Sequence, residues 1–267
     1  MPELPDVEQF KRIFDATGRG KTIRWVRLTA PELLKAGNAA DLKRTLAGKR
    51  LLRSRRRGKY LILDSPDLPK TLILHFGMTG NFRYLPRGGG AVRFSRLVLG
   101  FATGGELHWT NLRKLGRIFW VREAESLSAL RDMGPEPLAL SRSAFLNHLH
   151  RWERSNVKAF LMNQRKIAGI GNEYSDEILY RAGIHPRRKI RDLTARERST
   201  LFREMQRTLQ QAIAVGPPTG TFGPSWLTAR RSTDMRCPRN PRHALRKETI
   251  AGRSAVFCPV HQTQRPK

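Results

Sequence analysis

The chain begins with residues that could form a covalent bond to a sugar. Removal of Met1 would leave Pro2 with a free secondary amine beside the carboxylate of Glu3. An α-amino group has a pKa of about 8, so an appreciable fraction is nucleophilic at neutral pH. Attack on a sugar aldehyde carbon gives an iminium that acts as an electron sink for eliminating neighbouring phosphates, while Glu3 could move protons. Many chains begin with Met-Pro for no catalytic reason, so this pattern alone leaves both interpretations open.

A glycine-containing run at residues 163–172 could bind phosphate. Gly169 and Gly171 permit a tight turn, and the helix expected after them offers unpaired backbone N–H groups to an anion. An ordinary connection between two helices has a similar composition. The charge of the chain favours the phosphate-binding interpretation, because a strongly basic protein is expected to meet polyanions.

Composition and charge restrict the class of protein. The 51 Lys and Arg residues against 22 Asp and Glu give a net charge of +29, which indicates nucleic acid as the first candidate partner. No apolar run is long enough to cross a bilayer, and no amphipathic helix has a simply basic polar face, so a membrane partner is not expected. The acidic, proline-punctuated start does not resemble a signal peptide, which predicts a cytoplasmic or nucleoid location. Two cysteines, Cys237 and Cys258, exclude a disulfide framework.

The elements that must position these residues fall into two groups. Val7, Phe10, Ile13 and Phe14 share one face of a helix predicted over residues 5–17. Short β-like runs separated by turn residues follow, and they suggest an antiparallel β-sandwich with the first helix laid against it. The predicted strands cover 22–29, 51–64, 71–76, 81–85, 92–102, 106–109 and 117–121.

The second half of the chain has helical periodicity. A proline-rich linker at 131–142 precedes predicted helices at 143–151, 155–163, 173–182 and 194–214. The last begins with a capping box of Thr194 and Glu197. About 50 residues rich in Arg, Pro and Gly remain after Gly216, and a tail this polar needs a staple, such as a bound metal, to hold a structure.

Four separated stretches form one recognisable set: Pro2-Glu3-Leu4-Pro5, Arg57-Gly58-Lys59-Tyr60-Leu61, His75-Phe76-Gly77-Met78-Thr79-Gly80 and the segment 164–186. Together they resemble the formamidopyrimidine-DNA glycosylase and endonuclease VIII family, which excises oxidised bases from DNA. The resemblance implies an α+β fold. An N-terminal antiparallel β-sandwich with a flanking helix (1–130) and a linker (131–142) precede a helix–two-turn–helix domain (143–228) and a zinc-finger-like hairpin (229–267). It also implies that DNA binds in the cleft between the two domains.

The resemblance also assigns roles to single residues. Pro2 would attack C1′ of the damaged nucleoside, and Glu3 would assist at the ribose ring oxygen. Lys59, Lys158, Asn172 and Arg253 would contact DNA phosphates. Met78, Arg113 and Leu115 would fill the space left by the extruded base, an opening that costs a few kcal/mol in lost stacking. Leu115 stands where the glycosylase branch usually has phenylalanine, so it would be a smaller wedge between the bases. For Leu115 and Met78, packing in the hydrophobic core is the alternative role.

The tail departs from the family's finger, which has two C-x-x-C pairs. Here Asn240 and His261 occupy the second positions of the pairs begun by Cys237 and Cys258. Because imidazole suits zinc and an asparagine does not, we expect one structural Zn²⁺ held by Cys237, His243, Cys258 and His261. A finger-like hairpin without metal is the alternative.

The resemblance implies a monomeric, bifunctional DNA glycosylase and AP lyase that acts on double-stranded DNA containing oxidised bases or abasic sites. Pro2-Glu3-Leu4-Pro5 and Met78 favour the formamidopyrimidine branch. Leu115, Asp6 in place of the more usual glutamate, and a short segment at 216–236 leave open an endonuclease VIII-like pyrimidine specificity or mainly abasic-site lyase activity. A non-catalytic DNA- or RNA-binding protein with the same fold is an alternative of another class. A binder would need Lys59, Asn172 and Arg253 but not Pro2 and Glu3.

Overall fold

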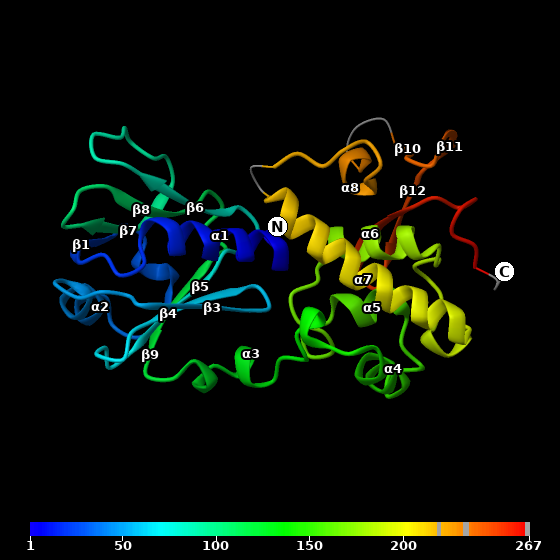
Figure 1. Ribbon diagram of the computed structural model, residues 1–267, viewed down its shortest axis with the longest axis horizontal. Coiled ribbons are helices and arrows are strands. Elements are labelled where there is room, and N and C mark those ends of the chain that lie inside the picture. Colours follow the sequence, from blue (N-terminus) through cyan, green and yellow to red (C-terminus); the bar gives the residue numbers. More distant parts are fainter. Residues whose placement is uncertain (218–219, 232–234, 265–267) are drawn as a thin grey trace. The chain divides into compact units, whose positions relative to one another are not determined.

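The computed structural model describes residues 1–217, 220–231 and 235–264 (Figure 1). The chain divides into two compact units, Met1–Asp132 and Met133–Lys267. Parts of the predicted helical domain and finger, residues 218–219, 232–234 and 265–267, lie outside the described residues. Within the part that the structure describes, no helix has both the length and the apolar character needed to span a membrane.

The first unit contains two β-sheets. One has the order β1-β7-β8-β6, formed by Ile23–Leu28, Ser95–Phe101, Glu106–Asn111 and Gly80–Leu85, all antiparallel. The other has the order β2-β9-β5-β4-β3, formed by Leu34–Ala36, Arg117–Val121, Thr71–His75, Tyr60–Asp64 and Arg53–Arg57. Only the pairing of β2 with β9 is parallel in this sheet.

The two sheets share one hydrophobic core, which confirms the predicted sandwich. Its residues alternate along the strands, because successive side chains of a strand point to opposite faces. Each of β4, β5, β7 and β8 contributes two buried residues at a spacing of two: Leu61 and Leu63, Leu72 and Leu74, Leu97 and Leu99, and Leu107 and Trp109.

Helix α1 (Leu4–Thr17) is fixed against this core by one face. Leu4, Val7, Phe10 and Phe14 are completely buried, and the ring of Phe10 lies 4.3 Å from that of Phe76 between centroids. The helix ends at Gly18, where an added Cβ would lie 3.1 Å from the ring of Phe101. The position of the N-terminal residues is therefore set by packing in the interior of the first unit.

Three features of the first unit differ from the sequence-based expectation. The predicted strand at 51–64 folds back at Gly58, whose φ of +54° suits a tight turn, and forms the β3–β4 hairpin. Helix α2 (Ala39–Leu46) and strand β2 were not predicted. A short helix, α3 (Ser128–Arg131), closes the unit.

The second unit is built on helices. They are α4 (Arg142–His150), α5 (Val157–Met162), α6 (Asn172–Ala182), α7 (Ala195–Val215) and α8 (Leu227–Arg230). The predicted capping box at the start of α7 is present, since Thr194 and Glu197 exchange side-chain to backbone hydrogen bonds. Helix α6 ends at Gly183, which has a φ of +68° in the left-handed region.

Two small hairpins complete the second unit. β10 (Arg236–Cys237) pairs with β11 (Asn240–Ala244), and β12 (Arg246–Ile250) pairs with β13 (Arg253–Phe257). The second hairpin turns through Ala251 and Gly252, both with positive φ. A small core formed by Tyr180, Leu227, Cys237, Leu245, Val256 and Cys258 joins the hairpins to α6 and α8.

Candidate DNA-binding and catalytic site

Pro2 and Glu3 lie at the start of α1. Pro2 is partly exposed, whereas only 1% of Glu3 is exposed. Glu3 is the N-cap residue, and its backbone N–H donates a hydrogen bond to Oδ2 of Asp6 at 2.8 Å. This capping box satisfies backbone donors that a helix start leaves without intrahelical partners. Asp6, which stands where the family more often has glutamate, therefore has a structural role. Its carboxylate fixes the backbone of Glu3, the residue after Pro2.

Lys59 lies in the turn of the β3–β4 hairpin and is largely buried. The hairpin is tied to α1 by an ion pair between Arg56 and Glu8 with an N–O distance of 2.9 Å. Burial and the charges of Lys59 and Arg117 lower the pKa of His75, on β5, to about 4. The imidazole of His75 is thus neutral at pH 7 and adds no further positive charge next to Lys59 and Arg117.

Met78, Arg113 and Leu115 lie in two connections of the first unit, Met78 between β5 and β6 and the other two between β8 and β9. Met78 is 45% exposed and Leu115 is 47% exposed, so neither belongs to the core. Nη1 of Arg113 lies 3.6 Å from Sδ of Met78, and the backbone N–H of Arg113 donates to the hydroxyl of Thr79 at 3.0 Å. The three predicted void-filling residues therefore form one exposed group.

Gly77 and Asn111 hold these two connections in contact. Gly77 has a φ of +62°, and a Cβ there would lie 2.5 Å from the carbonyl of Leu115. Asn111 donates from Nδ2 to the carbonyl of Phe76 at 2.8 Å and accepts from the N–H of Leu115 at 3.0 Å. The supporting role of Asn111 was not predicted, because no spacing in the sequence relates it to residue 76.

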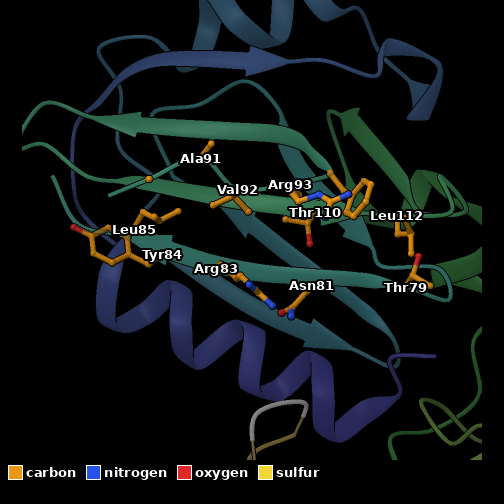
Figure 2. A pocket seen from close by; sticks show the side chains of 12 residues that line it. Thr79, Asn81, Arg83, Tyr84, Leu85, Ala91, Val92, Arg93, Thr110 and Leu112 are labelled. Atoms are coloured by element: carbon orange, nitrogen blue, oxygen red, sulfur yellow. The ribbon is translucent and has the colours of Figure 1, made fainter. Parts of the chain in front are cut away.

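A pocket of about 730 Å³ lies beside this exposed group and is lined mainly by β6 and by the connection between β6 and β7 (Figure 2). Thr79 and Leu112, the chain neighbours of Met78 and Arg113, line one end of it. Arg83 and Arg93 make it basic. Sequence patterns gave no indication of this pocket.

In the second unit, Asn172 is the first residue of α6. Gln164 shapes the loop before it by donating to the carbonyl of Ile170 at 2.7 Å and accepting from the N–H of Gly169 at 2.8 Å. Nδ2 of Asn172 donates to the hydroxyl of Ser254 at 3.4 Å. Asn172 thus adjoins the residue next to Arg253, whose side chain is exposed at the start of β13.

The predicted phosphate contact of Lys158 is wrong in this structure. The side chain of Lys158 is completely buried, and its ammonium is paired with the carboxylate of Asp176. A buried charge is stable only with such a partner. Lys158 therefore acts inside the unit rather than on its surface.

Three of the four predicted metal ligands lie together. The ligand atoms of Cys237, His243 and Cys258 are all within 4.8 Å of one another, with Nδ1 of His243 3.9 Å from Sγ of Cys258. Burial raises the pKa of the Cys258 thiol. For Cys237 burial acts in the same direction, but hydrogen bonds, above all from Tyr180, outweigh it and lower the pKa of that thiol.

His261 does not join this group. Its Nε2–H donates to the carbonyl of Tyr180 at 3.0 Å, and its Nδ1 accepts from the guanidinium of Arg239 at 3.2 Å. The prediction of His261 as a ligand therefore does not match the observed arrangement. The C-x-x-H spacing suggested the role, but both ring nitrogens of His261 have other partners, one on α6 and one in the turn of the β10–β11 hairpin.

Two stacked sheets with Pro2 and Glu3 at the start of their flanking helix, together with a helical unit that ends in two small hairpins, are typical of one enzyme class. It is the class of DNA glycosylases that contain a helix–two-turn–helix domain. Comparison with known proteins agrees with this conclusion. The family model of the formamidopyrimidine-DNA glycosylase N-terminal domain matches residues 1–118, and that of the formamidopyrimidine-DNA glycosylase H2TH domain matches residues 133–222.

Relatives extend the similarity over the whole chain. The formamidopyrimidine-DNA glycosylase of Pelotomaculum thermopropionicum is 32% identical over 98% of this chain and 99% of its own length. That of Moorella thermoacetica is 37% identical over 80% of this chain and 79% of its own. A structure of the Lactococcus lactis enzyme with abasic-site DNA has a TM-score of 0.84 and 30% identity, covering 97% of this chain and 99% of that one.

The chain belongs to the formamidopyrimidine-DNA glycosylase family. It is a DNA glycosylase of base-excision repair, and AP lyase activity is typical of its family.

Proposed function

We propose that Pro2 is the nucleophile of a combined glycosylase and lyase reaction. Its nitrogen adds to C1′, and the base leaves with the electron pair of the glycosidic bond. Opening of the sugar ring gives the iminium, with Glu3 placed to deliver a proton to the ring oxygen. Loss of protons from the sugar then expels the 3′ and the 5′ phosphates in turn. The observation that carries this proposal is the position of Pro2, directly before a capped helix whose face is buried in the core.

The DNA contacts that we propose come from both units. Lys59 in the first unit, and Asn172 and Arg253 in the second, bind phosphates near the lesion. An amide nitrogen has two hydrogens, so Nδ2 of Asn172 can donate to a phosphate as well as to Ser254. Met78, Arg113 and Leu115 fill the space of the extruded base, a role supported by the exposure of Met78 and Leu115 and by the contact of Arg113 with Met78.

The substrate that we propose is double-stranded DNA with an oxidised purine or an abasic site. The relatives that support it include the Lactococcus lactis enzyme in complex with DNA containing FAPY-dG. Leu115 is the observation that favours the second candidate, an endonuclease VIII-like preference for oxidised pyrimidines, because it offers less stacking area than phenylalanine. We further propose that the enzyme is monomeric and acts in the cytoplasm, at the nucleoid.

A structural zinc ion in the finger is also part of this proposal. Cys237, His243 and Cys258 provide the sulfur and nitrogen donors that zinc prefers, and two of them are buried. Their small core is too limited to order two hairpins without support. A tetrahedral site needs one further ligand beyond these three.

Borohydride trapping tests the proposed reaction. The probes are duplexes with 8-oxoguanine, an oxidised pyrimidine or an abasic site. We expect a covalent adduct with the processed chain, and none with Pro2→Gly or with a form that retains Met1, in which the proline nitrogen is an amide. The retained-Met1 form is the matched control, because its Pro2 and Glu3 are unchanged. The lesion that is trapped fastest identifies the preferred substrate. Tight binding without an adduct on any lesion would contradict the proposal and favour a non-catalytic binder.

A further inference from the structure

The carboxylate of Asp176, on α6, is the centre of a buried polar cluster. Only 1% of the residue is exposed. Its Oδ1 pairs with the ammonium of Lys158, and its Oδ2 pairs with Nη1 of Arg231 and accepts the N–H of Val256 at 2.9 Å. One carboxylate thus joins α5, α6, the end of α8 and strand β13.

The two cations of this cluster also reach the first residue of α6. Nζ of Lys158 and Nη1 of Arg231 each lie 3.5 Å from the carbonyl oxygen of Asn172. The hydroxyl of Ser175 donates to the same oxygen at 3.0 Å and lies 3.0 Å from Nζ of Lys158. The backbone of Asn172 is therefore held by groups that Asp176 itself holds.

The same cluster fixes the finger strand beside Asn172. Val256 and Ser254 are two residues apart on β13, so both can contact α6 from the same strand at successive positions. The N–H of Val256 binds Asp176, and the hydroxyl of Ser254 binds the side chain of Asn172. Arg253 directly precedes Ser254, and its place relative to Asn172 depends on this attachment.

We propose that Asp176 is a positioning residue that sets Asn172 and Arg253 in register for one DNA phosphate. The inference rests on the phosphate-binding role proposed above for these two residues. Buried ion pairs add little stability over apolar residues of similar size, but they can select one arrangement of the chain. A cluster that links two phosphate-binding elements fits such a role better than a role in stability alone.

A double-mutant cycle tests this coupling. We expect Arg253→Ala to weaken binding of abasic-site duplex about tenfold in the otherwise unchanged chain, as for loss of a hydrogen bond to a charged group. In the Asp176→Asn background the same change should have little further effect, since Arg253 is no longer held in place. The slope of log affinity against log salt should fall by about one for either single variant.

Glu197→Gln is the matched control, because the carboxylate of Glu197 is paired with the buried Arg188 in the same unit and its hydrogen bonds go to Arg188 and Thr194 rather than to α6 or β13. Its effect should add to that of Arg253→Ala and leave the salt slope unchanged. If Asp176→Asn does not fold, Lys158→Met/Asp176→Leu removes the buried charge pair in one step and is used in the same cycle.

The outcomes separate the two proposals. Additive effects of Asp176→Asn, or of the double replacement, with Arg253→Ala would overturn the positioning role while leaving the phosphate contact of Arg253 intact. No effect of Arg253→Ala in the unchanged chain would contradict the proposed DNA contact and the inference with it. A conservative Asp176→Glu variant should recover part of the affinity, because the carboxylate is kept.

Discussion

At the scale of single residues, the void-filling role proposed for Leu115 can be tested on two separate steps of the reaction. Leu115 is 47% exposed, so Leu115→Ala should cost little stability. We expect excision of an oxidised base from duplex DNA to slow about tenfold, because extrusion leaves a space that costs a few kcal/mol to keep open. Cleavage at a preformed abasic site should change much less, since no base is extruded.

Single-turnover rates on the two substrates, measured side by side, check this prediction. Leu115→Phe is the complementary variant, and its rate of base excision should equal or exceed that of the unchanged chain. Equal slowing on both substrates would show that Leu115 acts on the lyase chemistry or on folding instead.

The lowered pKa of His75 predicts how the stability of the first unit depends on pH. Its pKa is lowered to about 4 by burial and by the charges of Lys59 and Arg117. In the unfolded chain the pKa returns to about 6.5, so unfolded molecules bind a proton between pH 6.5 and 4 while folded molecules do not. The free energy of unfolding is therefore expected to fall by up to about 3 kcal/mol as the pH drops across this window.

Urea unfolding at pH 7 and at pH 4.5 measures this effect. His75→Gln removes the titrating group and should lose clearly less stability between the two pH values than the unchanged chain. The same loss in both proteins would mean that other groups control the pH dependence.

The burial of Lys158 could not be predicted from the sequence. Its partner Asp176 lies 18 positions further along the chain, and the pairing depends on how α5 packs on α6. A lysine on a helix has no spacing signal that distinguishes a solvent-facing cation from a buried one. The positions of Glu3 and Asn172 at the starts of helices were easier to predict, because the apolar periodicity after residue 5 and the glycines before residue 172 are visible in the sequence.

At the scale of elements, the spacing of apolar residues in the sequence predicted the regular helices and strands. The long helices and most strands of the sandwich appear where apolar residues repeat at helical or alternate spacing. Helix α2 was missed because it has eight residues and only Leu42 and Leu46 buried, too short a pattern to recognise. Its clearest signal was Asn38, which caps the helix by accepting from the N–H groups of Ala40 and Asp41.

The finger is an element whose ligand set can be tested directly. We expect His243→Ala to lose the bound zinc, because Nδ1 of His243 faces the two thiols. His261→Ala should retain it, because the ring of His261 is engaged by Tyr180 and Arg239 instead. Metal analysis of the purified proteins checks both variants, with about one zinc per unchanged chain expected for a single structural site.

Removal of the metal by a chelator should also lower the stability of the hairpins, since binding and folding of such a site are linked. Equal loss of zinc in both histidine variants would restore His261 to the ligand set. Unchanged zinc content in His243→Ala would exclude the three-residue group as the metal site.

At the scale of the whole molecule, the net charge of +29 governs DNA binding before any base is recognised. Each phosphate that the protein neutralises releases counterions and contributes about −0.9 to the slope of log affinity against log salt. For undamaged duplex DNA we therefore expect a slope of about −3 or steeper, corresponding to at least about three phosphates.

Equilibrium binding over a range of salt concentrations measures this slope. Lesion-containing duplex should bind more tightly with a slope of similar size, because base extrusion and void filling add contacts that involve no further ions. A slope near zero would contradict an electrostatic mode of binding.

The chain contains only two cysteines, and both are buried side by side in the finger. A thiol-specific reagent therefore has no other target in the protein, and the native state should react slowly. The mass gained on labelling reports how often the finger opens, without any introduced probe. Labelling in the presence and absence of DNA would then give the dynamics of this one hairpin pair within the intact chain.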